Sequence, residues 1–358
     1  MNKFYLKVGT GIFFVLLLLA GFSFLLQNQE RRYTSEEFLM DTLVSISTYG
    51  TDTDFLQQAT VKAFKEIRRI ADLTDRFPSP GTTAYMQSDV VKINERAGIS
   101  PVLVEEDVIK MLQLAQDYYL LTNGEFDVTI GALVDLWGFG RETQKIPTAG
   151  ELQKTLALVD SNKLILEQQA NTAFLAEKGM TLDLGAIAKG YAVEKAAQVL
   201  IEEGVEKALI NAGGNIRVIG EKDKNNAWKI GIQNPRDPSN LIGVLSINNE
   251  AAVTSGDYNR IIEIEGKNYH HLLSARTGYP ARNNMSVTVV TPDAGQADLL
   301  STSLFLLEPE QALEVVSKIS NVEVVIITTD KRILSSPGLR KKFEYRSGEG
   351  YSYEQNGL

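Results

Sequence analysis

Residues 180–192 read MTLDLGAIAKGYA, and this stretch predicts how the chain folds around its candidate site. The run MTLDL favours a β-strand that stops at Gly185, and apolar residues then recur on one helical face from Ile187 to Leu200. We therefore expect Gly185 at a strand-to-helix turn and Lys189 in the first turns of the helix. The free N–H groups and positive dipole end of a helix N-terminus favour a bound anion, and a nearby lysine adds a point charge for phosphate.

Asp183 lies at the end of this predicted strand, where it can accept hydrogen bonds from a ligand or hold a polar loop. A tight strand-to-helix turn with a solvated lysine explains the same residues without any ligand. The segment is therefore a candidate anion site that needs support from elsewhere in the chain.

The composition narrows the possible chemistry. The chain has 358 residues, of which 44% are hydrophobic and 23% charged, and its formal net charge is −9. That acidic surplus argues against nucleic acid as the main partner. No cysteine is present, which excludes disulfides, thiolate nucleophiles, cysteine-bound zinc or iron–sulfur clusters, and a lipid on an N-terminal cysteine. Any histidine catalysis must use His270 or His271, because the chain has no other histidine.

The N-terminus predicts a targeting or anchoring segment. Lys3 and Lys7 precede an apolar run over residues 8–26, which is long enough for one membrane-spanning helix. Positive charge before the run predicts a cytoplasmic N-terminus and an exported body. A cleaved signal peptide is the alternative, but the residues after Ser23 do not form a small-x-small cleavage site, which favours an uncleaved anchor.

The rest of the chain predicts an α+β fold, because strand-like and helix-like segments do not strictly alternate. Helices are expected at 54–73, 105–121, 296–306 and 309–316, besides the one after Gly185. Strands are expected at 39–48, 163–167, 173–176, 207–211, 216–219, 228–232, 243–247, 252–254, 260–264, 286–290 and 322–328.

A second candidate site is the segment ADLLST at 297–302. Thr302 follows Asp298 by four residues on a predicted helix, so the carboxylate and the hydroxyl share one face. Two oxygen ligands of this kind suit Mg²⁺, which often also takes phosphate oxygens from a substrate. The alternative is a helix N-terminus with Asp298 near the dipole and Thr302 in solvent.

Three further segments gather polar or aromatic groups. TSGDY at 254–258 places hydroxyls and an acid at a turn, and the histidine pair precedes the turn TGYP at 277–280. The pair could transfer protons, bind a metal or simply end a strand, and the local spacing does not select among these. TNGEFDVTIG at 122–131 leads to an aromatic patch at 136–140, which could face a flat ligand or fill the core.

Taken together, these segments resemble the ApbE family of FAD:protein FMN transferases, also called flavin transferases. The resemblance covers about residues 35–330. The segments that carry it are MDT at 40–42, GEFDVT at 124–129, DLGAIAKG at 183–190, NAGGN at 211–215, TSGDY at 254–258, HLL through TGYP at 271–280, and ADLLST at 297–302.

The resemblance implies a two-lobed α+β fold and Mg²⁺-dependent transfer of the FMN half of FAD to a Thr or Ser hydroxyl of an exported protein, with release of AMP. Matched position by position, His271 would be the catalytic base. Metal ligands would be the Ala186 carbonyl, Asp298 and Thr302. FAD would contact Met40, Phe77, Glu125, Phe126, Asp127, Asp183, Lys189 and Leu272; Tyr85 is the alternative to Phe77 as the aromatic at the ring.

The chain departs from the family at one place that concerns the base. Ser274-Ala275 stands where the family usually has Asp-Pro before Arg-Thr-Gly, which removes an acid and a rigid turn next to His271. Two other functions fit the same residues: hydrolysis of FAD to FMN and AMP, and FAD binding without chemistry.

The resulting division of the chain has four parts. Residues 1–27 are expected to be a membrane anchor or signal segment, 28–35 a linker, 36–345 the flavin transferase domain and 346–358 a flexible tail. The expected location is the cell membrane, with the catalytic domain on the extracytoplasmic side.

Overall fold

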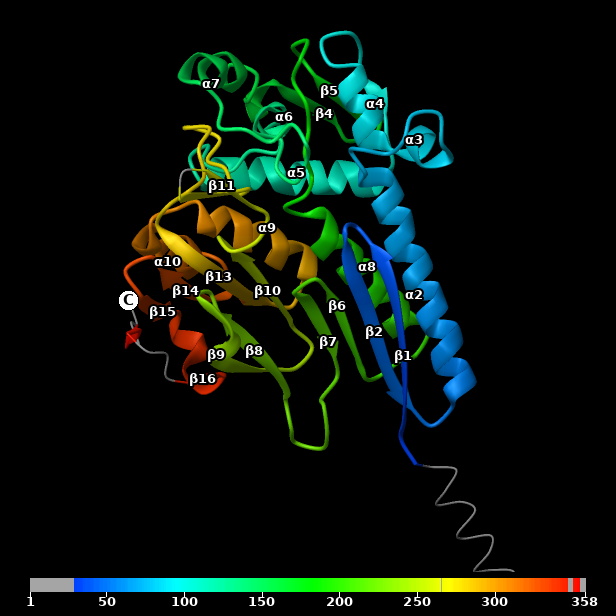
Figure 1. The fold of residues 1–358 in the computed structure, drawn as a ribbon. Coiled ribbons are helices and arrows are strands. Elements are labelled where there is room, and N and C mark those ends of the chain that lie inside the picture. The colour runs from blue at the N-terminus through cyan, green and yellow to red at the C-terminus, as the bar shows by residue number, and fades with distance from the viewer. Residues whose placement is uncertain (1–28, 265, 347–349, 355–358) are drawn as a thin grey trace, which may run out of the picture.

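The computed structural model describes residues 29–264, 266–346 and 350–354 (Figure 1). Its α-helices are α2 (Thr53–Thr74), α3 (Thr83–Gln87), α4 (Asp89–Glu95), α5 (Glu106–Leu121), α6 (Gly131–Trp137), α7 (Ala149–Leu156), α8 (Ala188–Glu202), α9 (Ala294–Phe305) and α10 (Pro309–Ser317). Its strands are β1 (Arg31–Leu39), β2 (Thr42–Gly50), β3 (Val102–Leu103), β4 (Leu164–Glu167), β5 (Thr172–Leu175), β6 (Ala208–Ala212), β7 (Asn215–Ile219), β8 (Trp228–Asn234), β9 (Asp237–Ile247), β10 (Ala251–Gly256), β11 (Ile261–Ile264), β12 (Lys267–His270), β13 (Asn284–Thr291), β14 (Glu323–Thr328), β15 (Arg332–Ser335), β16 (Phe343–Tyr345) and β17 (Ser352–Glu354).

A nine-stranded sheet, in the order β1-β2-β6-β7-β10-β13-β14-β15-β17, forms the body of the protein. Among the strand pairs that the structure describes, only β15 and β17 run parallel; the others in this sheet are antiparallel. The interior strand β13 is buried along its whole length, as expected for a strand covered on both faces. The α+β class predicted from the sequence is confirmed.

Different elements pack against the two faces of this sheet. Apolar residues of α2, α8, α9 and α10 form the main core against one face. On the other face, the three-stranded sheet β16-β9-β8 packs through Trp228, Ile230 and Ile232 onto residues of β13, β14 and β15. The protein is therefore layered as small sheet, large sheet and helices.

The chain segment from α3 to α7 forms an upper lobe together with the sheet β3-β5-β4 (Figure 1). A third apolar cluster holds part of this lobe to the β11–β12 hairpin, through Leu133, Trp137, Leu152, Ile262 and Leu273. The aromatic patch after residue 131 is thus core: Trp137 is fully buried, and its Nε1–H donates to the Gly278 carbonyl.

Three expectations from the sequence are wrong in detail. Residues 180–184 form no strand: Thr181 makes one parallel bridge to Ile130, and the helix begins at Ala188. Polar composition suggested a linker over 28–35, but residues 31–35 belong to β1 because β2 supplies hydrogen-bonding partners along the strand. Within the expected tail, Ser352–Glu354 forms β17 by pairing with β15.

The expected membrane anchor at residues 1–27 lies outside the described residues. Over the part of the chain that the structure does describe, none of the helices is both long and apolar enough to cross a bilayer.

Candidate active site

The crossing of α8 and α9 forms the centre of the candidate site. Gly190, in the first turn of α8, lies against α9 so closely that a Cβ atom there would come within 2.2 Å of the Ala294 carbonyl oxygen and 2.4 Å of Asp298 Cβ. Its N–H donates to Asp298 Oδ2 at 2.8 Å. One of the first-turn N–H groups, which have no partner within a helix, is thus satisfied by a carboxylate from the neighbouring helix.

Asp298 is a buried acid, 4% exposed. Burial raises the pKa of its carboxyl above the ordinary value, while the charge of Lys189, the Gly190 N–H and the Asn215 amide act in the opposite direction. Asn215, at the start of β7, is also buried, and its Nδ2 lies near enough to the Asp298 carboxylate to lower the pKa of that group but makes no hydrogen bond of regular geometry among the described residues. A desolvated carboxylate in this position favours a bound cation.

Thr302 lies one turn further along α9, on the face predicted from the spacing. Its hydroxyl is 3.1 Å from Ser255 Oγ, on β10, and Ser255 Oγ is also 2.9 Å from Ser301 Oγ. The half-buried Thr302 therefore faces the sheet rather than open solvent. In the sequence Ser255 is one of several hydroxyls at a predicted turn, and only the packing of α9 on β10 shows that it meets Thr302.

Lys189 follows the turn that contains Gly185 and Ala186, as predicted. Its Nζ donates to the Gly185 carbonyl oxygen at 3.2 Å, which directs the side chain back over the N-terminus of α8. Burial raises the pKa of Asp298 and lowers the pKa of His271, and the positive charge of Lys189 acts to lower both. The lysine is therefore close enough to affect the acid on α9 and the expected base, which the sequence separates by 27 residues.

The two histidines have different environments. His270 Nε2 donates to the Ala281 carbonyl at 2.8 Å, and its Nδ1 accepts from the Leu272 N–H at 3.3 Å. Both ring nitrogens are used, which identifies His270 as a structural strand end.

Only one ring nitrogen of His271, Nδ1, has a hydrogen-bond partner among the described residues. Nδ1 lies 3.1 Å from the Asn259 carbonyl oxygen, which can only accept, so Nδ1 carries the proton and Nε2 keeps its lone pair. Burial, followed by the positive charge of Arg260, lowers the pKa of His271 to about 4. The imidazole is therefore neutral at neutral pH and can accept a proton at Nε2.

Arg76 joins the segment 128–131 to the segment 181–183, a role that nothing in the sequence predicted. The Asp183 N–H donates to the Val128 carbonyl at 2.8 Å, so residues 128–131 and 181–183 run side by side. The buried Arg76 guanidinium donates to Asp183 Oδ2 at 3.2 Å and to the Gly131 carbonyl at 2.9 Å. Asp183 also accepts from the Gly185 N–H at 2.8 Å, so its carboxylate shapes the turn before α8.

Phe77 is 56% exposed and is held between two guanidinium groups. The guanidinium carbons of Arg76 and Arg141 lie 4.9 Å and 3.9 Å from its ring centroid. Phe77 and Tyr85 both line a depression of about 260 Å³ next to Thr181. The structure thus brings both aromatic candidates beside the same motif, and the choice of Phe77 stays a prediction.

Glu125 supports the loop that follows His271. Its carboxylate accepts from Ser274 Oγ at 2.6 Å and from Arg276 Nη1 at 3.3 Å. Ser274 Oγ in turn accepts from the N–H groups of Arg276 and Thr277, both at 3.2 Å. Ser274 therefore caps this turn with its hydroxyl, so the turn forms without the acid and the proline usual in the family.

The remaining predicted FAD residues are less accessible. Phe126 and Leu272 are buried, at 4% and 7% exposed, in the main core. The buried Asp127 carboxylate accepts four hydrogen bonds from Thr129 and Ser161. A direct FAD contact by Phe126, Asp127 or Leu272 stays a prediction; in this structure their side chains hold the loop.

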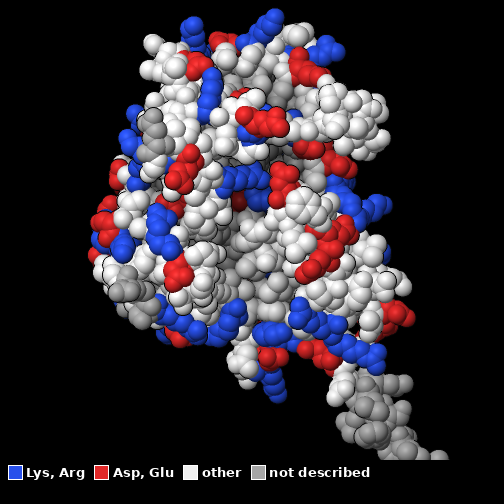
Figure 2. All heavy atoms as spheres, viewed as in Figure 1, with Lys and Arg blue, Asp and Glu red and all other residues white. Residues whose placement is uncertain are grey.

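Met40 lies with Asp41 at the tip of the β1–β2 hairpin, and both have positive φ, 53° and 60°, as a two-residue hairpin turn requires. Asp41 Oδ2 is 3.5 Å from Arg260 Nη2. Since Asn259, which binds His271, is the neighbour of Arg260, the hairpin tip borders the candidate site. Figure 2 shows that this side of the molecule is hollowed near the level of α8 and α9, with both basic and acidic side chains around the hollow.

The donor set fits a magnesium ion that is completed by a substrate. Among the described residues, no three acidic or histidine side chains gather as a metal cage. The site instead offers one buried carboxylate, Asp298, whose oxygens share a single backbone N–H donor, and the Thr302 hydroxyl one turn away. Mg²⁺ is typically bound by one or two carboxylates plus waters and substrate phosphates, so Asp298 and Thr302 are sufficient protein ligands of this kind.

Within this α+β fold, Lys189 and the buried Asp298 meet at the N-terminus of α8, and His271 lies near enough for the charge of Lys189 to affect its pKa. The chain belongs to the ApbE family, whose family model matches residues 40–326. It is a transferase of this family.

Curated relatives share most of its length. A protein named FAD:protein FMN transferase from Klebsiella pneumoniae is 35% identical over 318 residues, which covers 88% of this chain and 95% of the relative. One of the same name from Treponema pallidum is 29% identical and covers 86% of this chain and 88% of the relative.

Solved structures of the family share the fold. The ApbE protein of Thermotoga maritima is similar at a TM-score of 0.75 and 30% identity, over 83% of this chain and 94% of that one. The flavin transferase ApbE of Vibrio cholerae is similar at a TM-score of 0.72 and 25% identity, over 90% of this chain and 99% of that one.

Proposed function

We propose that this ApbE-family transferase moves the FMN half of FAD to a Thr or Ser hydroxyl of an exported protein, forming a phosphoester and releasing AMP. The relatives named above support FAD as the substrate and a protein as the acceptor. The observation that carries the proposal is the protonation of His271: Nδ1–H is bound to the Asn259 carbonyl, and Nε2 is left as a base beside Lys189.

The residues divide the work as follows. His271 Nε2 accepts the proton of the acceptor hydroxyl, whose oxygen attacks the phosphorus on the FMN side of the diphosphate. The bond from that phosphorus to the bridging oxygen breaks, and AMP leaves with this oxygen. Lys189 neutralises diphosphate charge at the N-terminus of α8 while the phosphorus is attacked.

Asp298, Thr302 and the Ala186 carbonyl would hold Mg²⁺. When bound, the ion supplies charge neutralisation and fixes the positions of diphosphate oxygens. Without it, Asp298 keeps the first turn of α8 in place through the Gly190 N–H.

We also propose that residues 1–27 anchor the protein in the cell membrane, with the catalytic body on the extracytoplasmic side. Positive charge before a long apolar run supports this orientation. An exported acceptor at the same membrane would then be within reach.

The deciding experiment mixes the protein with FAD, Mg²⁺ and a pool of threonine-containing peptides and follows intact masses. We expect peptides that gain the mass of the FMN moiety, together with AMP in equal amount. Free FMN and AMP with no modified peptide would identify an FAD hydrolase instead. FAD that stays intact in both the presence and the absence of Mg²⁺ would identify a binding protein.

A further inference from the structure

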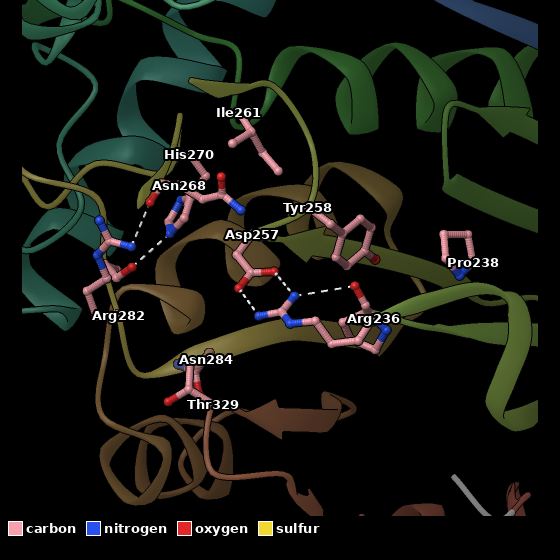
Figure 3. Close-up of a pocket in the computed structure, with 12 residues that line it drawn as sticks. Arg236, Pro238, Asp257, Tyr258, Ile261, Asn268, His270, Arg282, Asn284 and Thr329 are labelled. Atoms are coloured by element: carbon pink, nitrogen blue, oxygen red, sulfur yellow. Dashed lines mark hydrogen bonds and ion pairs between the residues drawn. The ribbon is translucent and has the colours of Figure 1, made fainter. Parts of the chain in front are cut away.

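A second cavity lies beside the catalytic histidine and contains none of the residues assigned to FAD or Mg²⁺. It has a volume of about 480 Å³, and its walls include Arg236, Asp257, Tyr258, His270, Arg282 and Asn284 (Figure 3). The walls come from the β8–β9 connection, the segment after β10, strand β12 and the segment leading into β13. Its volume is within the range of pockets that bind small molecules, so it is large enough to take part of a polypeptide ligand.

The residues that line the cavity are chain neighbours of His271 and of its hydrogen-bond partner Asn259. Asp257 and Tyr258 line the cavity, and Asn259, the next residue, accepts the hydrogen bond from His271 Nδ1. His270 also lines the cavity and directly precedes the base in the chain. A polypeptide that offers a hydroxyl to His271 therefore has this cavity next to it.

The cavity carries a net positive charge. Arg236 and Asp257 neutralise each other through two hydrogen bonds, of 2.7 Å and 2.6 Å. His270 is neutral because its Nδ1 accepts a hydrogen bond. Arg282 is exposed: its Nη1 donates to the Asn268 carbonyl at 2.8 Å, and its guanidinium lies 5.2 Å from the Tyr269 ring centroid. Among the described residues, Arg282 has no carboxylate partner.

One buried side chain that lines the cavity, Asn284, has an oxygen atom that receives no hydrogen bond from the described residues. Asn284 is 1% exposed, and its Nδ2 donates to the carbonyls of Phe305 and Leu307 at 3.0 Å and 2.9 Å. Its Oδ1 has no partner among the described residues. An unpaired buried carbonyl oxygen favours a ligand or a water that brings an N–H or O–H donor.

We propose that this cavity binds the acceptor polypeptide and that Arg282 recognises an acidic side chain near the hydroxyl that is modified. This inference rests on the proposed function, because it names the subsite of the same reaction that holds the protein substrate. A peptide fits both unpaired features: a carboxylate pairs with the guanidinium, and main-chain N–H groups supply donors. FAD has its own site on the residues of α8 and α9.

The test uses a pool of 13-residue peptides with a central threonine and random residues elsewhere. Wild type, Arg282→Gln, Arg282→Glu and a control, Arg340→Glu, are each given the pool with FAD and Mg²⁺. Arg340 is an exposed arginine outside the cavity. Flavin-labelled peptides are isolated by fluorescence and sequenced by mass spectrometry, and the melting temperature of each variant confirms that it folds.

We expect the wild type and Arg340→Glu to select peptides with Asp or Glu near the threonine. In Arg282→Gln this preference should fall about 3- to 5-fold, the size of one partly exposed ion pair. In Arg282→Glu it should turn toward Lys and Arg. A wild type without acid preference, or an unchanged preference in Arg282→Glu, overturns the cavity proposal and leaves the transferase proposal standing. If the wild type labels no peptide at all, the transferase proposal fails and the cavity proposal fails with it.

Discussion

At the scale of single residues, one hydrogen bond decides which histidine can act as a base. His270 uses both ring nitrogens, whereas His271 uses one. We predict that His271→Ala lowers FMN transfer by about 10²- to 10⁴-fold, the usual contribution of a general base. FAD affinity, measured by flavin fluorescence, should change little. Transfer at the wild-type rate would show that another group takes the proton.

The pH profile tests the same residue without a mutation. An ordinary histidine gains a proton near pH 6.5 and would lose its function as a base below that pH. Because burial and Arg260 lower the pKa of His271 to about 4, the neutral base persists to lower pH. We predict that kcat/KM for transfer holds between pH 7 and pH 5 and falls as the pH approaches about 4. A fall centred near 6.5 would contradict this environment for His271.

Substitution of Asp298 should lower activity without lowering stability. Burial disfavours its charged form, so Asp298→Asn removes a costly buried charge and keeps the shape. We predict a melting temperature equal to or above that of the wild type without Mg²⁺, and a loss of transfer of about 100-fold or more. Ser303→Ala, on the same helix, removes a buried hydroxyl without a partner among the described residues and should leave transfer unchanged. Full activity in Asp298→Asn would rule out the acid as a metal ligand.

At the scale of elements, the site depends on how closely α8 approaches α9. Gly190 makes this contact possible, because a side chain would meet the Ala294 carbonyl and Asp298. We predict that Gly190→Ala costs about 1–3 kcal/mol of stability and lowers transfer, since the helices must separate. Chemical denaturation measures the first effect and AMP release the second.

The matched control for this substitution is Gly150→Ala in α7. A Cβ atom at Gly150 meets nothing within 4 Å, and the helix gains a better helix former. The change should stabilise the protein by about 0.5–1 kcal/mol and leave transfer unchanged. Equal effects at the two glycines would mean that the close approach of α8 and α9 is unimportant.

At the scale of the whole molecule, β1 links the N-terminal segment to the site. The strand begins at Arg31 and ends at the hairpin tip with Met40, which borders the site. We predict that removal of residues 1–28 leaves the catalytic body folded and active but moves it from the membrane fraction to the soluble fraction. Activity assays and fractionation of the two forms check this. A full-length protein found in the soluble fraction would contradict the anchor.

The sequence by itself predicted the class of fold and the long elements α2, α5, α8 and α9. Apolar periodicity over a long helix is a local property, and burial of that face leaves few other arrangements. The prediction that Asp298 and Thr302 lie one turn apart on the same helix is also confirmed, because it depends only on helical geometry. The predicted strand at 180–184 is wrong, since a strand needs hydrogen-bonding partners along its length and only one bridge forms there.

Tertiary structure alone decided how the motifs meet. Arg76 holds Asp183 and Gly131, Ser255 meets Thr302, and the Gly190 N–H binds Asp298; each pair is far apart in the chain. The protonation of His271 likewise depends on the Asn259 carbonyl, which the β11–β12 hairpin brings beside it. Local sequence determines which elements form, whereas the packing of distant elements determines which polar atoms are left to bind a ligand, because each atom's partners come from outside its own segment.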